Sequence, residues 1–253
     1  MPKTRRRRKS KTRPLAIFVG TLALVVVLVY VGSKLARTRA LQPYAPGLPL
    51  ISVKATPKEI NFGGCPPEGG GGDRDLNLLK NRVDEGNYVP VELSAVLALP
   101  WPKSIEQVPR RRWYSQDAQS VAMYEGIPLS LEGYLAGARE QGPESTNCRG
   151  MEPDARDFHL WLVGSPGQDR SSSLVAEVSP RVRASHPQWT IEAIQELVSS
   201  GEKVRISGWL MLDPEHPDQV GRTRGTIWEI HPIMNIEVTR NNSWTPLDTI
   251  APR

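Results

Sequence analysis

The chain of 253 residues contains few of the side chains on which most catalytic sites depend. It has two cysteines, four histidines and three phenylalanines, and aromatic residues make up 6% of it. Cys65 and Cys148 are too far apart in the chain to form a metal-binding cysteine motif. A P-loop, a dinucleotide fingerprint, an HExxH zinc motif and a GxSxG elbow are all absent. The sequence therefore predicts no cofactor and leaves the catalytic residues, if there are any, unknown.

Acidic residues are absent from the first 40 positions, which carry eleven lysines and arginines. The whole chain has a net charge of +5, so residues 41–253 carry −6. A nucleic-acid-binding domain needs basic side chains to neutralise phosphates. The charge of the domain thus argues against nucleic acid as a partner, although the basic tail raises the pI of the whole chain to about 9.3.

Charge is also absent between Arg13 and Lys34, and residues 15–31 are almost wholly apolar. About 20 helical residues cross the roughly 30 Å hydrocarbon core of a membrane, so residues 14–33 are predicted to be a transmembrane helix. Eight cationic residues precede it and three follow closely. This bias puts the basic tail, residues 1–13, in the cytoplasm and the remainder outside it. The alternative is a cleaved signal peptide, but the apolar run is long and "SKLARTRA" is a poor cleavage site.

An extracytoplasmic position makes the two cysteines informative. Oxidising compartments permit disulfides, so we expect Cys65 and Cys148 to form one. The alternative is two free thiols, of which Cys148 could be a nucleophile if His159 or His216 lay beside it as a base.

Proline and glycine dominate residues 34–72, which are predicted to be a flexible stalk that includes "GGCPPEGGGGD". In residues 73–124, "DRDLNLLKNRVD" predicts a short helix with Asp73 or Asp75 as its N-cap, and "PVELSAVLALPWP" predicts a short apolar segment. These pieces are too short to fold alone and are expected to pack on the next domain. Residues 240–253 are predicted to be a disordered tail.

Alternating apolar and polar residues predict strands through residues 125–239. Three come first: "IPLSLEGYLAGAR", with a bend at Gly133, then "DFHLWLV" and "SLVAEVS". A helix follows, with Thr190 as N-cap and Gly201 as its stop. The segments "KVRISGWLML" and "TIWEIHPIMNIEV" predict the fourth and fifth strands.

This order of three strands, one helix and two strands resembles the OB-fold, a five-stranded Greek-key barrel. The resemblance covers residues 125–239 and implies a mainly β domain. The stretches "LNLLKNR", "ESTNC", "DFHLWLV" and "WEIHPIMNIEV" also resemble uncharacterised exported bacterial proteins, and this second resemblance implies no activity.

The OB-fold resemblance implies that ligands bind the outer face of strands two and three and the neighbouring loops. In strand five, period 2 puts Trp228, Ile230, Met234 and Ile236 toward the core and Glu229 and His231 outside. Trp161 could stack on a ring, and two loop arginines could grip an anion. The predicted ligand-binding residues are His159, Trp161, Arg222, Arg224, Glu229 and His231. Ordinary solvated side chains are the alternative for each.

Three functions remain open. The first is a single-pass, membrane-anchored protein whose extracytoplasmic OB-like domain binds a protein or a small polar ligand. The second is a metal-assisted hydrolase of phosphoesters or glycosides that uses His159, Glu229 and His231. If one strand separates the two histidines, their backbones lie about 9–10 Å apart, which disfavours a shared zinc ion. The third is a structural subunit of an envelope complex.

Overall fold

The computed structural model describes residues 62–250. The predicted cytoplasmic tail, the predicted transmembrane helix at 14–33 and most of the predicted stalk lie outside these residues. Within residues 62–250, none of the helices has both the length and the apolar character needed to cross a membrane.

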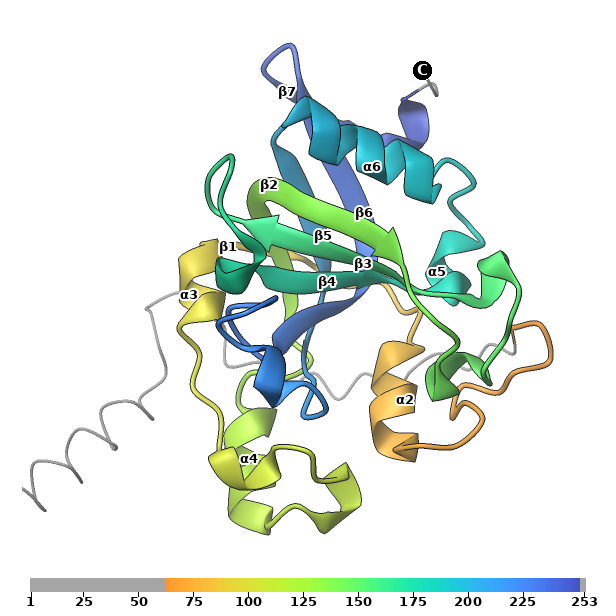
Figure 1. Ribbon diagram of the computed structural model, residues 1–253, viewed down its shortest axis with the longest axis vertical. Helices are drawn as coiled ribbons and strands as arrows, with labels where there is room; N and C mark the ends of the chain where they lie inside the picture. The colour runs from red at the N-terminus through yellow and green to blue at the C-terminus, as the bar shows by residue number, and fades with distance from the viewer. Residues whose placement is uncertain (1–61, 251–253) are drawn as a thin grey trace, which may run out of the picture. The chain divides into compact units, whose positions relative to one another are not determined.

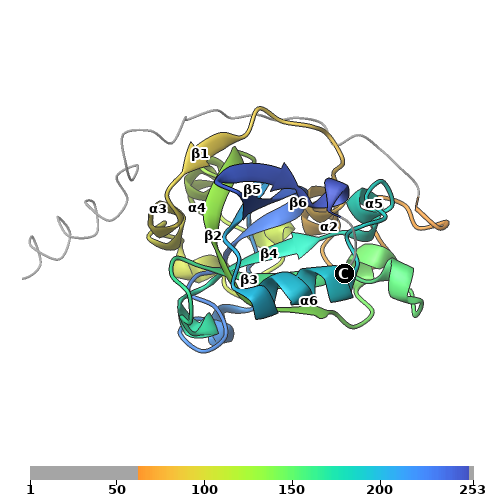
Figure 2. The same ribbon diagram turned by 90° about the horizontal axis from the view of Figure 1, so that it is seen from above.

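A closed, five-stranded barrel forms the centre of the described region. Its strands follow one another around the barrel in the order β2-β3-β4-β6-β5, and β5 pairs again with β2 to close it. All of these pairings are antiparallel except that of β4 with β6. Seen from above, the labelled strands surround a common interior (Figure 2). The strands are β2 (Pro128–Glu140), β3 (Phe158–Val163), β4 (Leu174–Val178), β5 (Val204–Leu212) and β6 (Trp228–Arg240).

The helix between the third and fourth barrel strands is α6 (Ile191–Ser200), which lies across the upper end of the barrel in Figure 1. It begins where the Thr190 hydroxyl accepts a hydrogen bond from the Ala193 backbone N–H at 3.1 Å. It ends at Gly201, whose φ of +63° is left-handed. Both ends agree with the sequence-based prediction. The strand order and the position of α6 make this an OB-like barrel.

The first barrel strand, β2, changes its neighbour at Gly133. Residues 128–133 pair with β5, and residues 134–140 pair with β3. A Cβ atom at this position would lie 2.5 Å from the carbonyl oxygen of Val163. Glycine is required here because β2 and β3 approach each other too closely for a side chain.

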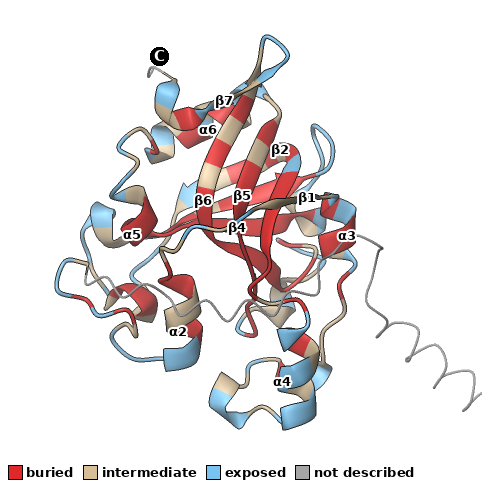
Figure 3. Ribbon diagram, turned by 180° about the vertical axis from the view of Figure 1, so that it is seen from behind, coloured by how far each residue is buried: buried red, intermediate tan, exposed pale blue. Residues whose placement is uncertain are grey.

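The inner faces of the barrel strands form the core. Trp228, Ile230 and Ile236 are fully buried and Met234 is nearly so, as the alternation in strand five predicts. Figure 3 shows buried residues along most of the barrel strands and exposed ones along the loops. The Trp228 ring packs edge-on against Tyr124 with 6.0 Å between centroids. Segment 73–124 therefore contributes to the core of the barrel.

Short elements precede the barrel, as predicted for residues 73–124, and include α2, whose N-cap is Asp73. One of them, β1, pairs in parallel with β2 and was not predicted. The helices and strands are α2 (Arg74–Lys80), β1 (Val89–Val91), α3 (Leu93–Leu97) and α4 (Ser115–Ala122); α5 (Pro180–Arg183) follows β4. Short 3₁₀ helices occupy Lys103–Ile105, Arg110–Arg112, Ser145–Asn147, Pro153–Ala155, Arg170–Ser172, Pro217–Gln219 and Leu247–Thr249.

The prediction of a disordered tail from residue 240 is wrong for its described part. Ser243–Pro246 forms β7, which pairs antiparallel with β6. The turn between them is made by Asn241 and Asn242, with φ of 51° and 60°. Asparagine tolerates this left-handed conformation, and two such residues suit the two-residue turns that join hairpin strands. The asparagine pair was the sequence signal that the prediction overlooked.

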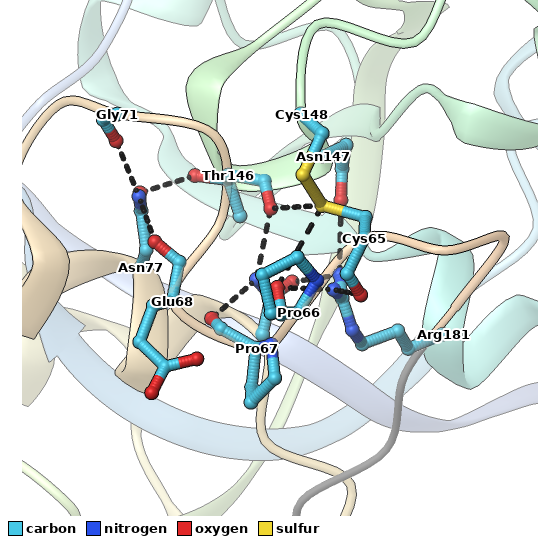
Figure 4. Close-up of a disulfide and its surroundings, with 11 residues drawn as sticks. Cys65, Pro66, Pro67, Glu68, Gly71, Asn77, Thr146, Asn147, Cys148 and Arg181 are labelled. Carbon is cyan, nitrogen blue, oxygen red and sulfur yellow. Dashed lines mark hydrogen bonds between the residues drawn. A yellow bond between two sulfur atoms is a disulfide. The ribbon is translucent and has the colours of Figure 1, made fainter.

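The end of the predicted stalk, residues 62–72, is held against the barrel domain. The structure joins Cys65 to Cys148 in a disulfide, and the described part contains no free cysteine. Arg181 donates hydrogen bonds to the Cys65 and Pro66 carbonyls at 3.0 and 2.9 Å. Figure 4 shows these contacts around the disulfide. Composition alone indicated flexibility, which the cross-link and the buried arginine prevent here.

Candidate functional site

A cleft of about 690 Å³ opens over the outer face of β3 and β4. Its walls come from α2, the β2–β3 loop and the β5–β6 loop, which are the two loops that the OB-fold resemblance implicated. This volume is typical of small-molecule sites. The disulfide helps to build the cleft because it ties the segment preceding α2 to the β2–β3 loop.

A histidine, a glutamate and a second histidine lie in a row on β3, β4 and β6. His159 Nε2 is 2.7 Å from Glu177 Oε1, and His231 Nδ1 is 3.0 Å from Glu177 Oε2. The strand order agrees with the expectation that one strand separates the two histidines. That expectation left out the carboxylate on the intervening strand, which contacts both rings.

A second charged group lies beside this row. The buried Arg224 guanidinium donates a hydrogen bond to Glu229 Oε1, and its Nη1 is 3.7 Å from Asp213 Oδ2. All three side chains are at most 2% exposed. Burying any of these charges alone would cost several kcal/mol, so each depends on the others.

Lys80, in the last turn of α2, adds a cation from the other side of the cleft. Its side chain is 5% exposed, and its Nζ lies 3.9 Å from Glu144 Oε2. Burial alone would lower the pKa of Lys80, but Glu177 and Glu144 hold it well above its ordinary value. The lysine therefore stays charged beside the cleft.

The two buried glutamates have opposite pKa shifts. Burial raises the pKa of Glu229 to about 8, although Arg224 opposes the shift. Burial also acts on Glu177, but the positive charges of His159, His231 and Lys80 outweigh it and hold its pKa well below its usual range. Within the described residues, the site thus combines an ionised carboxylate with one that retains a proton near neutral pH.

Three arginines and a tryptophan lie around the mouth of the cleft. The Arg170 guanidinium stacks over Trp161 at 4.0 Å from the ring centroid, and Arg139 lies at 5.6 Å. The absence of a side chain at Gly137 leaves space for Arg170, because a Cβ atom at Gly137 would lie 2.6 Å from Arg170 Nη2. Arg222 is exposed on the β5–β6 loop and also lines the cleft.

The structure brings the predicted ligand-binding residues to one region but gives them different environments. His159 lines the cleft with a side chain 14% exposed. Glu229 and His231 are fully buried, so the prediction that they lie on an open surface is wrong. Their strand face does point out of the barrel, but α2 and the loops cover it.

Two further expectations need correction. Trp161 is 5% exposed and already stacked with an arginine, so no open ring face awaits a ligand. Arg224 is neutralised by Glu229 and Asp213, which leaves Arg222 as the available member of that predicted pair. Cys148 is in the disulfide and therefore cannot be a nucleophile.

The sequence analysis did not assign Lys80, Arg139, Arg170 or Glu177 to the site. Glu177 had a visible signal, because it is the one charged residue in the apolar strand LVAEV. Lys80 had no such signal in the sequence. A lysine in the last turn of a short helix is ordinarily exposed, and its charge interacts favourably with the helix dipole there. Only the packing of α2 over the barrel buries it.

The cleft is lined by arginine side chains and by the imidazole of His159. The arginines could bind an anion with charge-assisted hydrogen bonds. His159, oriented by Glu177, could transfer a proton to or from a ligand in the cleft. The atoms of Glu177, Glu229 and His231 that face one another offer oxygen and nitrogen donors to a cation.

Comparisons with known proteins add little to this description. No family model and no curated protein matches the chain. Six chains of solved structures match, among them one from the crystal structure of yeast Stn1 and Ten1. The similarity covers 65% of this chain and 69% of that one at 13% identity, with a TM-score of 0.32. A likeness this weak carries no argument, so the assignment of an OB-like barrel rests on strand order and pairing.

Proposed function

We propose that this protein is a single-pass, membrane-anchored protein whose extracytoplasmic OB-like domain binds a small anionic ligand in the cleft. The observation that carries the proposal is the pair of arginines, Arg170 and Arg222, at the cleft mouth. Neither guanidinium donates a hydrogen bond to another residue in the range 62–250. Each therefore retains the planar set of donors that suits a phosphate or a carboxylate.

The contrast with Arg224 strengthens this argument. That arginine is buried with Glu229 and Asp213, as a purely structural arginine would be. Arg170 and Arg222 instead line an open cleft in a chain whose residues 41–253 carry a net charge of −6. Carboxylates also line the cleft, so it is the unpaired guanidinium donors of Arg170 and Arg222 that favour a small anion over general attraction to polyanions.

Membrane anchoring rests on the sequence of residues 1–40. An apolar run of sufficient length is flanked by eight cationic residues before it and three after it. The disulfide between Cys65 and Cys148 supports the same topology, because disulfides persist in oxidising compartments.

Protease added to intact spheroplasts should remove the C-terminal domain, since the charge bias puts residues 34–253 outside the cytoplasm. Immunoblotting with an antibody to the C-terminus measures the loss, and a cytoplasmic protein is the protection control. If both stay intact until detergent is added, the proposed topology is wrong.

The purified full chain in detergent should bind p-nitrophenyl phosphate, and both Arg170→Ala and Arg222→Ala should weaken that binding by about tenfold or more. A charge-assisted hydrogen bond contributes about 1.5–3 kcal/mol, and 1.4 kcal/mol corresponds to a factor of ten. Gly137→Ala should also weaken binding, because its Cβ displaces Arg170 without removing a charge. Isothermal titration calorimetry measures these affinities.

Arg111→Ala is the matched control, because Arg111 is exposed and does not line the cleft. Equal affinities for wild type, Arg170→Ala and Arg222→Ala would reject the cleft as the anion site. The same samples with Zn²⁺ added test the alternative function, metal-assisted hydrolysis of a phosphoester with His159, Glu229 and His231. Release of p-nitrophenolate that His159→Ala abolishes would make the protein an enzyme, and binding without release would make it a binding protein.

A further inference from the structure

We propose that Glu177, Glu229 and His231 form a buried site for one divalent transition-metal ion beneath the cleft. The site goes beyond anion binding and does not depend on it. Its three donor atoms are Glu177 Oε2, Glu229 Oε2 and His231 Nδ1. They all lie within 4.8 Å of one another. His231 Nδ1 lies 3.0 Å from Glu177 Oε2 and 4.0 Å from Glu229 Oε2. Ligand atoms bonded to one ion at about 2.0–2.2 Å are at most about 4.4 Å apart, so an ion fits here after at most a small movement of the side chains.

The hydrogen bonding of these three atoms supports the proposal. Each is buried, and none forms a hydrogen bond with another residue of the described chain. His231 Nδ1 and Glu177 Oε2 approach to 3.0 Å, yet their geometry is not that of a hydrogen bond. An unsatisfied buried polar atom costs about 1–3 kcal/mol. Three of them converging on one point indicate a missing common partner.

The other oxygen of each carboxylate has a charged or titratable side chain beside it. His159 contacts Glu177 Oε1 at 2.7 Å, and Arg224 donates to Glu229 Oε1. These partners orient both carboxylates so that their second oxygens face His231. Metal sites commonly have such outer partners, which hold the ligands in place.

Carboxylates are numerous around the site. Five carboxylates and three lysine or arginine side chains interact there, and the imidazoles of His159 and His231 contact the same group. The carboxylates are Glu144, Asp157, Glu177, Asp213 and Glu229, and the cations are Lys80, Arg181 and Arg224. A metal ion would add a cation where carboxylates outnumber lysine and arginine side chains.

The donor set indicates the class of metal. One imidazole and two carboxylates suit Zn²⁺ or Mn²⁺ better than Ca²⁺, which prefers oxygen ligands alone. Three protein ligands also leave at least one coordination position open. Glu177 lines the cleft, so an ion could enter from that side.

The test uses the full chain in detergent, first stripped with EDTA and then titrated with Zn²⁺ in a calorimeter. Wild type should bind one equivalent, and Glu177→Gln and Glu229→Gln should each weaken binding at least about 100-fold. Glu215→Gln is the matched control, because it removes a carboxylate at the cleft wall but outside the donor set. Circular dichroism verifies that each variant is folded.

A second measurement keeps the proposal testable if the buried variants do not fold. In wild type with ¹⁵N-labelled histidine, Zn²⁺ should shift the Nδ1 resonance of one ring. That shift should persist in His159→Gln, His186→Gln and His216→Gln, which leaves His231 as its source.

The proposal is overturned if wild type binds no stoichiometric Zn²⁺ or Mn²⁺, or if the folded Glu177→Gln and Glu229→Gln variants bind like the control. The first result would mean that a proton on Glu229 takes the place of the metal. Binding of p-nitrophenyl phosphate in EDTA separates the two proposals, since the cleft arginines need no metal.

Discussion

Replacing Trp228 with alanine should lower the free energy of unfolding by about 3–5 kcal/mol, the usual range for removing a large core side chain. Trp228 is fully buried, packs against Tyr124 and donates a hydrogen bond from Nε1 to the Pro100 carbonyl at 3.3 Å. The ring thus joins the barrel to segment 73–124, and alanine would leave a cavity at that junction. Urea unfolding followed by tryptophan fluorescence or circular dichroism measures the change.

Asn235→Ala on the same strand is the control. Asn235 is partly exposed on the outer face, so its loss should change stability by about 0.5 kcal/mol or less. Similar unfolding midpoints for the two variants would contradict the assignment of strand faces.

Removing the disulfide with Cys65→Ser and Cys148→Ser together should lower the free energy of unfolding by about 4 kcal/mol. The two cysteines are 83 residues apart. In the chain-entropy model a cross-link over a loop of this length destabilises the unfolded chain by roughly that amount. The substitution should also loosen α2, because the segment before it would lose its covalent tie to the β2–β3 loop.

Wild type unfolded in the presence of a reducing agent should match the double serine variant, since both lack the cross-link. A loss below about 1 kcal/mol in both would show that the hydrogen bonds from Arg181 and Asn81 hold residues 62–72 by themselves. An Arg181→Met variant removes the hydrogen bonds to the Cys65 and Pro66 carbonyls, and its free energy of unfolding measures their contribution.

The β strands were predictable because a strand has a strict period of 2. That period separated Trp228 and Ile230 from Glu229 and His231, and the structure places the first pair in the core. Local hydrogen bonds also made helix ends predictable, as the Thr190 hydroxyl and the left-handed Gly201 show. The order of these elements was sufficient to indicate an OB-like barrel.

The hairpin to β7 was predictable in principle. Two consecutive asparagines after a strand are a turn signal, but the segment after them, SWTP, is short and exposed or half-exposed. Its pairing with β6 depends on an edge of the barrel, which the local pattern does not display.

Sequence periodicity by itself determined which strand side chains point away from the barrel interior. The distribution of charged residues by itself separated a basic N-terminal tail from an acidic domain. Only the tertiary structure decided that the outward face of β3, β4 and β6 is covered. Lys80 and Glu177 are 97 positions apart, and local pattern carries no information about contacts at such separations. Burial of these charges follows from the disulfide, the packing of α2 and the two barrel loops. The same packing turns Glu229 and His231 from predicted surface residues into parts of a buried ionic cluster.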